Sequence, residues 1–88
     1  MNESMQEYRT ILTNNPAKAE KQLYKLAKKG DLDALSALND YYEKCVTEAK
    51  TPKELSKIRQ KALKAALLGA AQNSPYWLIV VGEMYRYG

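Results

Sequence analysis

Proline-initiated helix starts are the feature that most restricts what this chain can fold into. Proline directly follows a capping residue at three places: Asn15-Pro16, Thr51-Pro52 and Ser74-Pro75. Proline suits the first helical position because its missing N–H would have no partner there and its φ angle is already helical. Gly30 follows two lysines as a typical helix end, and Asp31 is placed to cap the next helix. This punctuation predicts a chain of consecutive helices.

Apolar spacing supports about five helices, over residues 3–13, 16–29, 32–48, 52–71 and 75–87. Apolar residues recur three and four positions apart, as Leu35, Leu38 and Tyr42 do, which is the spacing of one helix face. The apolar run 77–81 has the composition of a strand, but the chain offers it no partner strand, so we expect a buried helix there. The predicted fold class is all-α, in a single domain.

The chain also repeats itself after 43 residues, and a fixed period of this size is typical of stacked helical repeats. Four pairs of matching residues carry the repeat: Ala19 with Ala62, Ala27 with Ala70, Leu38 with Val81, and Tyr42 with Tyr85. The predicted architecture is a short α/α solenoid. Within the single domain 1–88, an N-terminal capping helix in 1–15 precedes one helix-turn-helix repeat in 16–50 and a second in 51–88.

The two copies resemble the Sel-one-like repeat, a subclass of the tetratricopeptide-like α/α repeats, over about residues 16–88. The second copy ends in VGEMYRYG, similar to the family's closing L-G-x-x-Y-x-x-G. Asn73 stands where the family has a turn glycine, and Trp77 where it has a small alanine, so looser or rearranged packing is expected at Trp77. Tyr42 and Tyr85 fit the family's structural tyrosine and are expected in the core. The resemblance implies a scaffold that binds a peptide or protein partner.

Several kinds of chemistry lack their usual residues. The chain has no histidine, the commonest general base and metal ligand, and its one cysteine, Cys45, is expected to be half-buried rather than reactive. The four glycines are too scattered for a phosphate-binding loop. We therefore expect no enzymatic activity, no cofactor and no metal. The N-terminus lacks a secretory signal and no apolar run could span a membrane, so a cytoplasmic protein is predicted.

Lysines form a stripe on each of two predicted helices. The stripes are spaced three and four residues apart and consist of Lys18, Lys21, Lys25 and Lys28 on one helix and Lys53, Lys57, Lys61 and Lys64 on the other. All of these except Lys53 are predicted contact residues. One interpretation is electrostatic contact with an acidic partner or with nucleic acid. The other is a plain solvated helix face. Arginine, which reads bases and phosphates with a planar fork, is scarce, and this weakens the nucleic-acid interpretation.

A second candidate surface is aromatic and acidic, because tyrosine and tryptophan dominate binding surfaces that are partly wet. Its residues are Asp40, Tyr41, Tyr76, Trp77 and Tyr87. Packing against the N-terminal helix is the alternative for the aromatic members. The function predicted first is a protein-interaction module, an adaptor or inhibitor, that binds a larger protein through this surface. The alternatives are electrostatic binding through the lysine stripes, and a structural homo-oligomer joined through the C-terminal helix.

Overall fold

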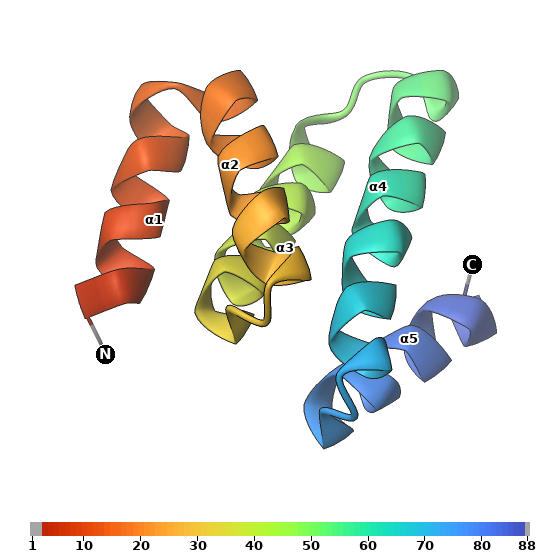
Figure 1. Cartoon of the computed structure of the whole chain (residues 1–88). Coiled ribbons are helices and arrows are strands. Elements are labelled where there is room, and N and C mark those ends of the chain that lie inside the picture. The colour runs from red at the N-terminus through yellow and green to blue at the C-terminus, as the bar shows by residue number, and fades with distance from the viewer. Residues whose placement is uncertain (1–2, 88) are drawn as a thin grey trace.

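The computed structural model describes residues 3–87, which form five helices and no strand (Figure 1). In chain order the helices are α1 (Glu3–Asn14), α2 (Pro16–Lys28), α3 (Leu32–Glu48), α4 (Pro52–Ala71) and α5 (Pro75–Tyr87). The all-α prediction is confirmed, and each predicted helix begins and ends within one residue of its place in the structure.

Side-chain caps start α2, α3 and α4 at the predicted residues. In each case a side-chain oxygen accepts a hydrogen bond from the backbone N–H three residues later: Asn15 from Lys18, Asp31 from Ala34, and Thr51 from Glu54. At α4 the carboxylate of Glu54 also accepts from the backbone N–H of Lys50 at 3.2 Å, one residue before the cap. These bonds satisfy N–H groups that a helix start leaves without an internal partner.

The turn between α2 and α3 and the turn between α4 and α5 are built alike. Gly30 has a φ of 106°, and Asn73, which lies 43 residues later, has a φ of 60°. Equivalent backbone hydrogen bonds close both turns: Lys29 to Leu26, Gly30 to Ala27 and Asp31 to Leu26 in the first, and Gln72 to Gly69, Asn73 to Ala70 and Ser74 to Gly69 in the second. Asparagine can replace glycine here because it tolerates left-handed backbone better than most residues. The repeat in sequence is therefore also a repeat in backbone structure.

The helices stack in chain order, as in an α/α solenoid (Figure 1). Consecutive helices pack together, and α1–α3 and α2–α4 contacts join helices that are next but one. The two turns also meet, because the side-chain amide of Gln72 donates to the carbonyl of Ala27 at 2.9 Å. Within the described residues, α1 and α5 lie at opposite ends of the stack and do not touch.

Small residues form much of the core and let the helices approach closely. Among the described side chains, twelve hydrophobic ones are buried: Leu12, Ala19, Leu23, Ala27, Ala34, Leu35, Ala37, Leu38, Tyr42, Ala65, Ala66 and Trp77. Eight of them, Tyr42 included, belong to α2 and α3. The core is thus densest in the first repeat, which has packed helices on both sides.

Trp77 is buried in the junction of α4 and α5, with 2% of its surface exposed. Its partner is Gly69, where an added Cβ would lie 2.6 Å from the Cβ of Trp77. The equivalent positions in the first repeat, 43 residues earlier, are Leu26 and Ala34. In the first repeat the large residue is on the first helix and the small one on the second, and in the second repeat this arrangement is reversed. Rearranged packing at Trp77 was predicted, and this exchange is the form that it takes, without the predicted looseness.

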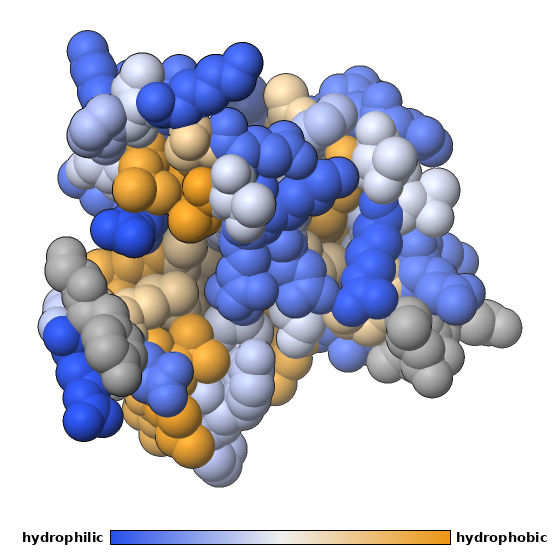
Figure 2. Space-filling model, turned by 180° about the vertical axis from the view of Figure 1, so that it is seen from behind, coloured by the Kyte–Doolittle hydropathy of each residue, from blue (hydrophilic) through white to orange (hydrophobic). Residues whose placement is uncertain are grey.

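The helix expected over 77–81 is present, but the prediction that it is buried is wrong. Helix α5 is the least covered element of the described chain, since it packs against α4 alone. Most of the large exposed apolar residues lie on it: Tyr76, Leu78, Ile79 and Tyr85. Figure 2 shows apolar surface gathered on the side of the molecule that carries α4 and α5. The prediction that Tyr85 belongs to the core is wrong, because Tyr85 is 66% exposed whereas its repeat equivalent Tyr42 is 4% exposed. Tyr42 is covered because α3 has helices on both sides.

Polar contacts hold α1 on the first repeat. Tyr8 donates a hydrogen bond from its hydroxyl to Asp31, the residue that also caps α3. The guanidinium of Arg9 pairs with the carboxylate of Asp40 on α3 at 2.8 Å. Leu12 supplies the buried apolar contact. Helix α1 therefore covers the free side of α2 and α3, where the predicted capping helix was expected.

Replacing Tyr8 with phenylalanine is expected to lower the free energy of unfolding by about 1 kcal/mol at neutral pH, since one partly buried hydrogen bond is lost. The hydrogen bond to Asp31, followed by burial, raises the pKa of Tyr8 to about 12, from an ordinary value of 10. A raised folded-state pKa means that this stabilisation is complete below about pH 10 and is lost as the pH rises toward 12. The difference between wild type and Tyr8→Phe should therefore shrink above pH 10 in urea unfolding.

Tyr85→Phe is the matched control, because it removes the hydroxyl of an exposed tyrosine at the other end of the stack. We expect it to change the free energy of unfolding by less than about 0.5 kcal/mol. A Tyr8→Phe difference that stayed constant from neutral pH to pH 12 would show that the hydrogen bond to Asp31 does not stabilise the fold.

Candidate binding groove

The packing of α2 against α4 brings the two lysine stripes together. A groove opens between these helices, with Tyr42 of α3 among its lining. Its described lining residues are Glu20, Lys21, Tyr24, Lys25, Lys28, Tyr42, Lys61 and Lys64. Five of the seven predicted lysines line it. The other two, Lys18 and Lys57, are exposed on α2 and α4 outside the lining. Helical spacing put each set of lysines on one face, and the contact between α2 and α4 made the two faces neighbours.

One end of the groove contains a carboxylate. Glu20 on α2 accepts a hydrogen bond from the hydroxyl of Tyr42 at 2.8 Å and pairs with the ammonium of Lys61 at 3.7 Å. Burial, and then the bond to Glu20, raises the pKa of Tyr42 well above its ordinary value. The tyrosine hydroxyl therefore remains a proton donor to Glu20 at any physiological pH. This cluster ties α2, α3 and α4 together.

The other end of the groove has two ammonium groups beside an aromatic ring. The Nζ atoms of Lys28 and Lys64 lie 5.6 Å and 6.0 Å from the ring centroid of Tyr24. The two lysines belong to different helices and converge on the same side chain. A cation near an aromatic face gains about 0.5–1 kcal/mol at an exposed site. Among the described residues, no carboxylate lies within ion-pair distance of either lysine.

Glu20 and Tyr24 were missed by the sequence analysis, although a signal for them was available. Both lie at four-residue intervals with Lys28, which places all three residues on one face of α2. A stripe defined by lysines alone leaves out the acidic and aromatic residues on the same helix face. Tyr42 was predicted as a core residue, which its burial confirms, but its hydroxyl also reaches the groove.

The predicted aromatic and acidic surface is not brought together. Asp40 and Tyr41 lie on α3 and Tyr76 on α5, and these two helices do not touch in the described chain. Asp40 is paired with Arg9 of α1. Tyr41 is half-buried, and burial followed by a hydrogen bond to Cys45 raises its pKa to about 12. Cys45 itself is half-buried, as predicted.

Trp77 has to be withdrawn from the predicted contact surface. It is 2% exposed, because Gly69 leaves room for its ring in the contact between α4 and α5. Its alternative predicted position, against the N-terminal helix, is also wrong, since α1 and α5 do not meet in the described chain. Tyr76 is 59% exposed and packs edge-on against Trp77. The side chain of Tyr87 lies outside the described residues.

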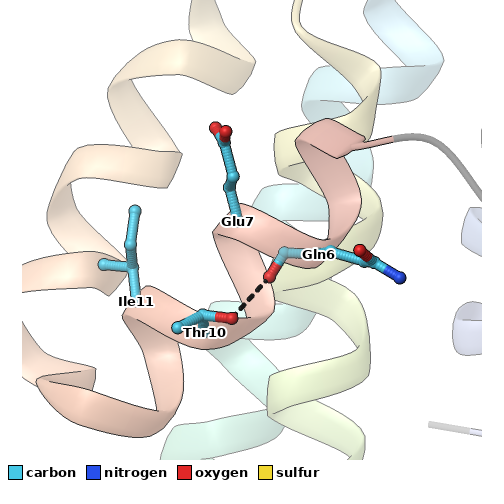
Figure 3. Close-up of a pocket in the computed structure, with 4 residues that line it drawn as sticks. All are labelled: Gln6, Glu7, Thr10 and Ile11. Atoms are coloured by element: carbon cyan, nitrogen blue, oxygen red, sulfur yellow. Dashed lines mark hydrogen bonds between the residues drawn. The ribbon is translucent and has the colours of Figure 1, made fainter.

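A second hollow lies along α1, lined by Gln6, Glu7, Thr10 and Ile11 (Figure 3). All four residues belong to one helix, and the hydroxyl of Thr10 donates to the carbonyl of Gln6 within that helix at 2.8 Å. Their side chains point in different directions rather than toward a common centre. Among its described lining residues, this hollow therefore has no converging groups like those of the groove between α2 and α4.

No family model, curated protein or solved structure matches this chain. The resemblance to Sel-one-like repeats therefore stays a prediction, carried by the 43-residue offset and the matching turns. Within residues 3–87, no helix has the length and apolar character that crossing a membrane requires. The same residues contain no cluster of three or more histidine, cysteine, aspartate or glutamate side chains that could hold a metal ion.

Proposed function

We propose that this chain is a protein-interaction module that binds an acidic segment of a partner protein in the groove between α2 and α4. The observation that carries the proposal is the convergence of five lysines from two helices on a groove whose described lining includes one carboxylate, Glu20. Such an excess of one charge in a concave surface attracts ligands of the opposite charge. The proposed function keeps the interaction module predicted from the sequence. Its contact surface, however, is the lysine-lined groove instead of the aromatic and acidic surface.

The chemistry of the lining favours a polypeptide over nucleic acid. Lysine offers a flexible point charge without the fork that reads phosphates and base edges, and no arginine is among the described lining residues. Lysine stems and the rings of Tyr24 and Tyr42 add apolar surface between the charges. A segment that mixes carboxylates with apolar side chains complements both features. We therefore expect acidic peptides to bind more tightly than single-stranded DNA of equal charge.

The test is the binding of a dye-labelled peptide of alternating glutamate and leucine, measured by fluorescence anisotropy at several salt concentrations. Reversing two groove charges with Lys25→Glu and Lys64→Glu is expected to weaken binding by about tenfold or more, since like charges then face each other. The matched control is Lys44→Glu with Lys53→Glu, which changes the net charge equally at exposed positions outside the groove lining. The control should weaken binding about twofold, through the overall field alone.

Two results would contradict the proposal. Equal weakening by the groove pair and the control pair would mean that the peptide responds to net charge and not to the groove. Tighter binding of the DNA, lost in the groove pair, would assign the groove to nucleic acid. Circular dichroism spectra of both double variants should match that of the wild type, because all four positions are exposed.

A further inference from the structure

The groove contains two clusters of the same kind, set one helical turn apart. On α2, Glu20, Tyr24 and Lys28 follow one another at four-residue intervals along one face. On α4, Lys61 and Lys64 are three residues apart and also share a face. The distances pair them in order, since Lys61 meets Glu20 at 3.7 Å while Lys64 lies 6.0 Å from the ring centroid of Tyr24.

In the first cluster, the carboxylate already has a hydrogen-bond donor and a cationic partner. The carboxylate of Glu20 is bonded by the Tyr42 hydroxyl at 2.8 Å and faces the ammonium of Lys61. Only 22% of the Glu20 side chain is exposed, so the groove already holds one carboxylate between a tyrosine and a lysine. The lining of the groove therefore already accommodates a carboxylate.

The second cluster has the tyrosine and the lysines but no carboxylate within the described chain. Lys28 and Lys64 approach one ring from two helices, so two positive charges lie near Tyr24. A negative group that approaches Tyr24 would be attracted by both. The excess of positive charge is therefore local, and it is centred on Tyr24.

We infer that the ammonium groups of Lys28 and Lys64, above Tyr24, form the position that receives a carboxylate from an aspartate or glutamate of the partner, beside the position that Glu20 already fills. This inference rests on the proposed function. It makes Glu20 an internal competitor, because the charge of Glu20 occupies Lys61 and repels an incoming acidic segment. The same groove thus has one intramolecular and one intermolecular acidic ligand.

The first test compares single neutral substitutions in the anisotropy assay with the glutamate–leucine peptide. Lys28→Gln and Lys64→Gln are each expected to weaken binding by about three- to fivefold. This is close to the largest effect expected from the loss of one exposed ion pair. Lys21→Gln is the matched control, because it removes the same charge from the groove lining outside the Tyr24 cluster. It should weaken binding less than twofold. Equal effects of all three substitutions would overturn the inference while leaving the groove as the binding surface.

The second test is a gain of affinity. Glu20→Gln keeps an acceptor for the Tyr42 hydroxyl but removes the negative charge beside Lys61. We expect the peptide to bind about two- to fivefold more tightly to this variant. Unchanged or weaker binding, with the wild-type circular dichroism spectrum retained, would show that Glu20 does not compete. If no acidic peptide binds the wild type at low salt, the proposed function itself fails.

The third test separates a carboxylate from other anions. The peptide is compared with a version in which one glutamate is replaced by phosphoserine, against wild type and Lys64→Gln. Similar affinities for the two peptides support a carboxylate position. A preference of more than about tenfold for the phosphopeptide, lost in Lys64→Gln, would assign the position to a phosphoryl group instead.

Discussion

Replacing Trp77 with alanine is expected to lower the free energy of unfolding by about 3–5 kcal/mol, the usual cost of emptying a buried aromatic site. Trp77 is the one buried side chain described for α5, and α5 packs against α4 alone in the described chain. A chain of this length has a total stability of roughly 4–13 kcal/mol, so the loss takes a large share of it. We expect α5 to detach first, because no other helix holds it in place.

Urea unfolding measures the total loss, and hydrogen exchange of the α5 amides shows whether that helix opens before the others. Ile79→Ala is the matched control, since Ile79 lies on the same helix and is 64% exposed. It should change stability by less than about 0.5 kcal/mol. Should Trp77→Ala cost no more than Ile79→Ala, the contact between α4 and α5 would not depend on the buried ring.

The second large effect is expected at Gly69, where alanine should destabilise the fold by about 1–3 kcal/mol through overpacking. A Cβ added to Gly69 would lie 2.6 Å from both the Cβ and the Cδ1 of Trp77. The Cβ of Trp77 is fixed to its backbone, so rotation of the side chain cannot relieve the clash and the helices must move apart. In most helix interiors the same change stabilises by about 1 kcal/mol, because alanine is the better helix former.

Gly82 provides a control with the opposite sign. An added Cβ there meets nothing within 4 Å, so Gly82→Ala is expected to stabilise α5 by about 0.5–1 kcal/mol. Thermal or urea unfolding of the two alanine variants should therefore move in opposite directions. Stabilisation by Gly69→Ala would mean that the space beside Trp77 is not as tight as the structure has it.

A double substitution tests the exchange of large and small residues directly. Gly69→Leu with Trp77→Ala places in the second repeat the pair that the first repeat has in Leu26 and Ala34. We expect the double variant to be more stable than either single variant, with a favourable coupling energy of about 1–3 kcal/mol in a double-mutant cycle. Additive losses would show that the two repeats do not pack equivalently at this point.

The positions of the helices were predictable because their signals are local. Proline, a capping side chain and the spacing of apolar residues act within a few positions of one another, and the capping hydrogen bonds of Asn15, Asp31 and Thr51 confirm them. The offset of 43 residues likewise identified Asn73 as the equivalent of Gly30, and both have positive φ. Backbone conformation at a turn depends on the residue that occupies it, and the sequence gives the identity of that residue.

The groove was only half predictable. Helical spacing identified the two lysine faces, but only the contact between α2 and α4 made them neighbours. Tyr24 lies beside Lys64, and Glu20 pairs with Lys61. Both partners are more than thirty positions away in the chain, so no local sequence pattern predicts these contacts. The aromatic surface failed for the same reason, because α3 and α5 carry its parts without touching in the described chain.

The proline-initiated helices and their turns are what the sequence by itself determined, since caps, φ preferences and apolar spacing are short-range effects. The tertiary structure alone decided which side of each helix is covered. Tyr42 and Tyr85 occupy equivalent places in the two repeats, yet one is buried and the other is exposed. The physical reason is that burial depends on what packs against a helix: α3 has α1, α2 and α4 around it, whereas α5 rests on α4 alone in the described chain.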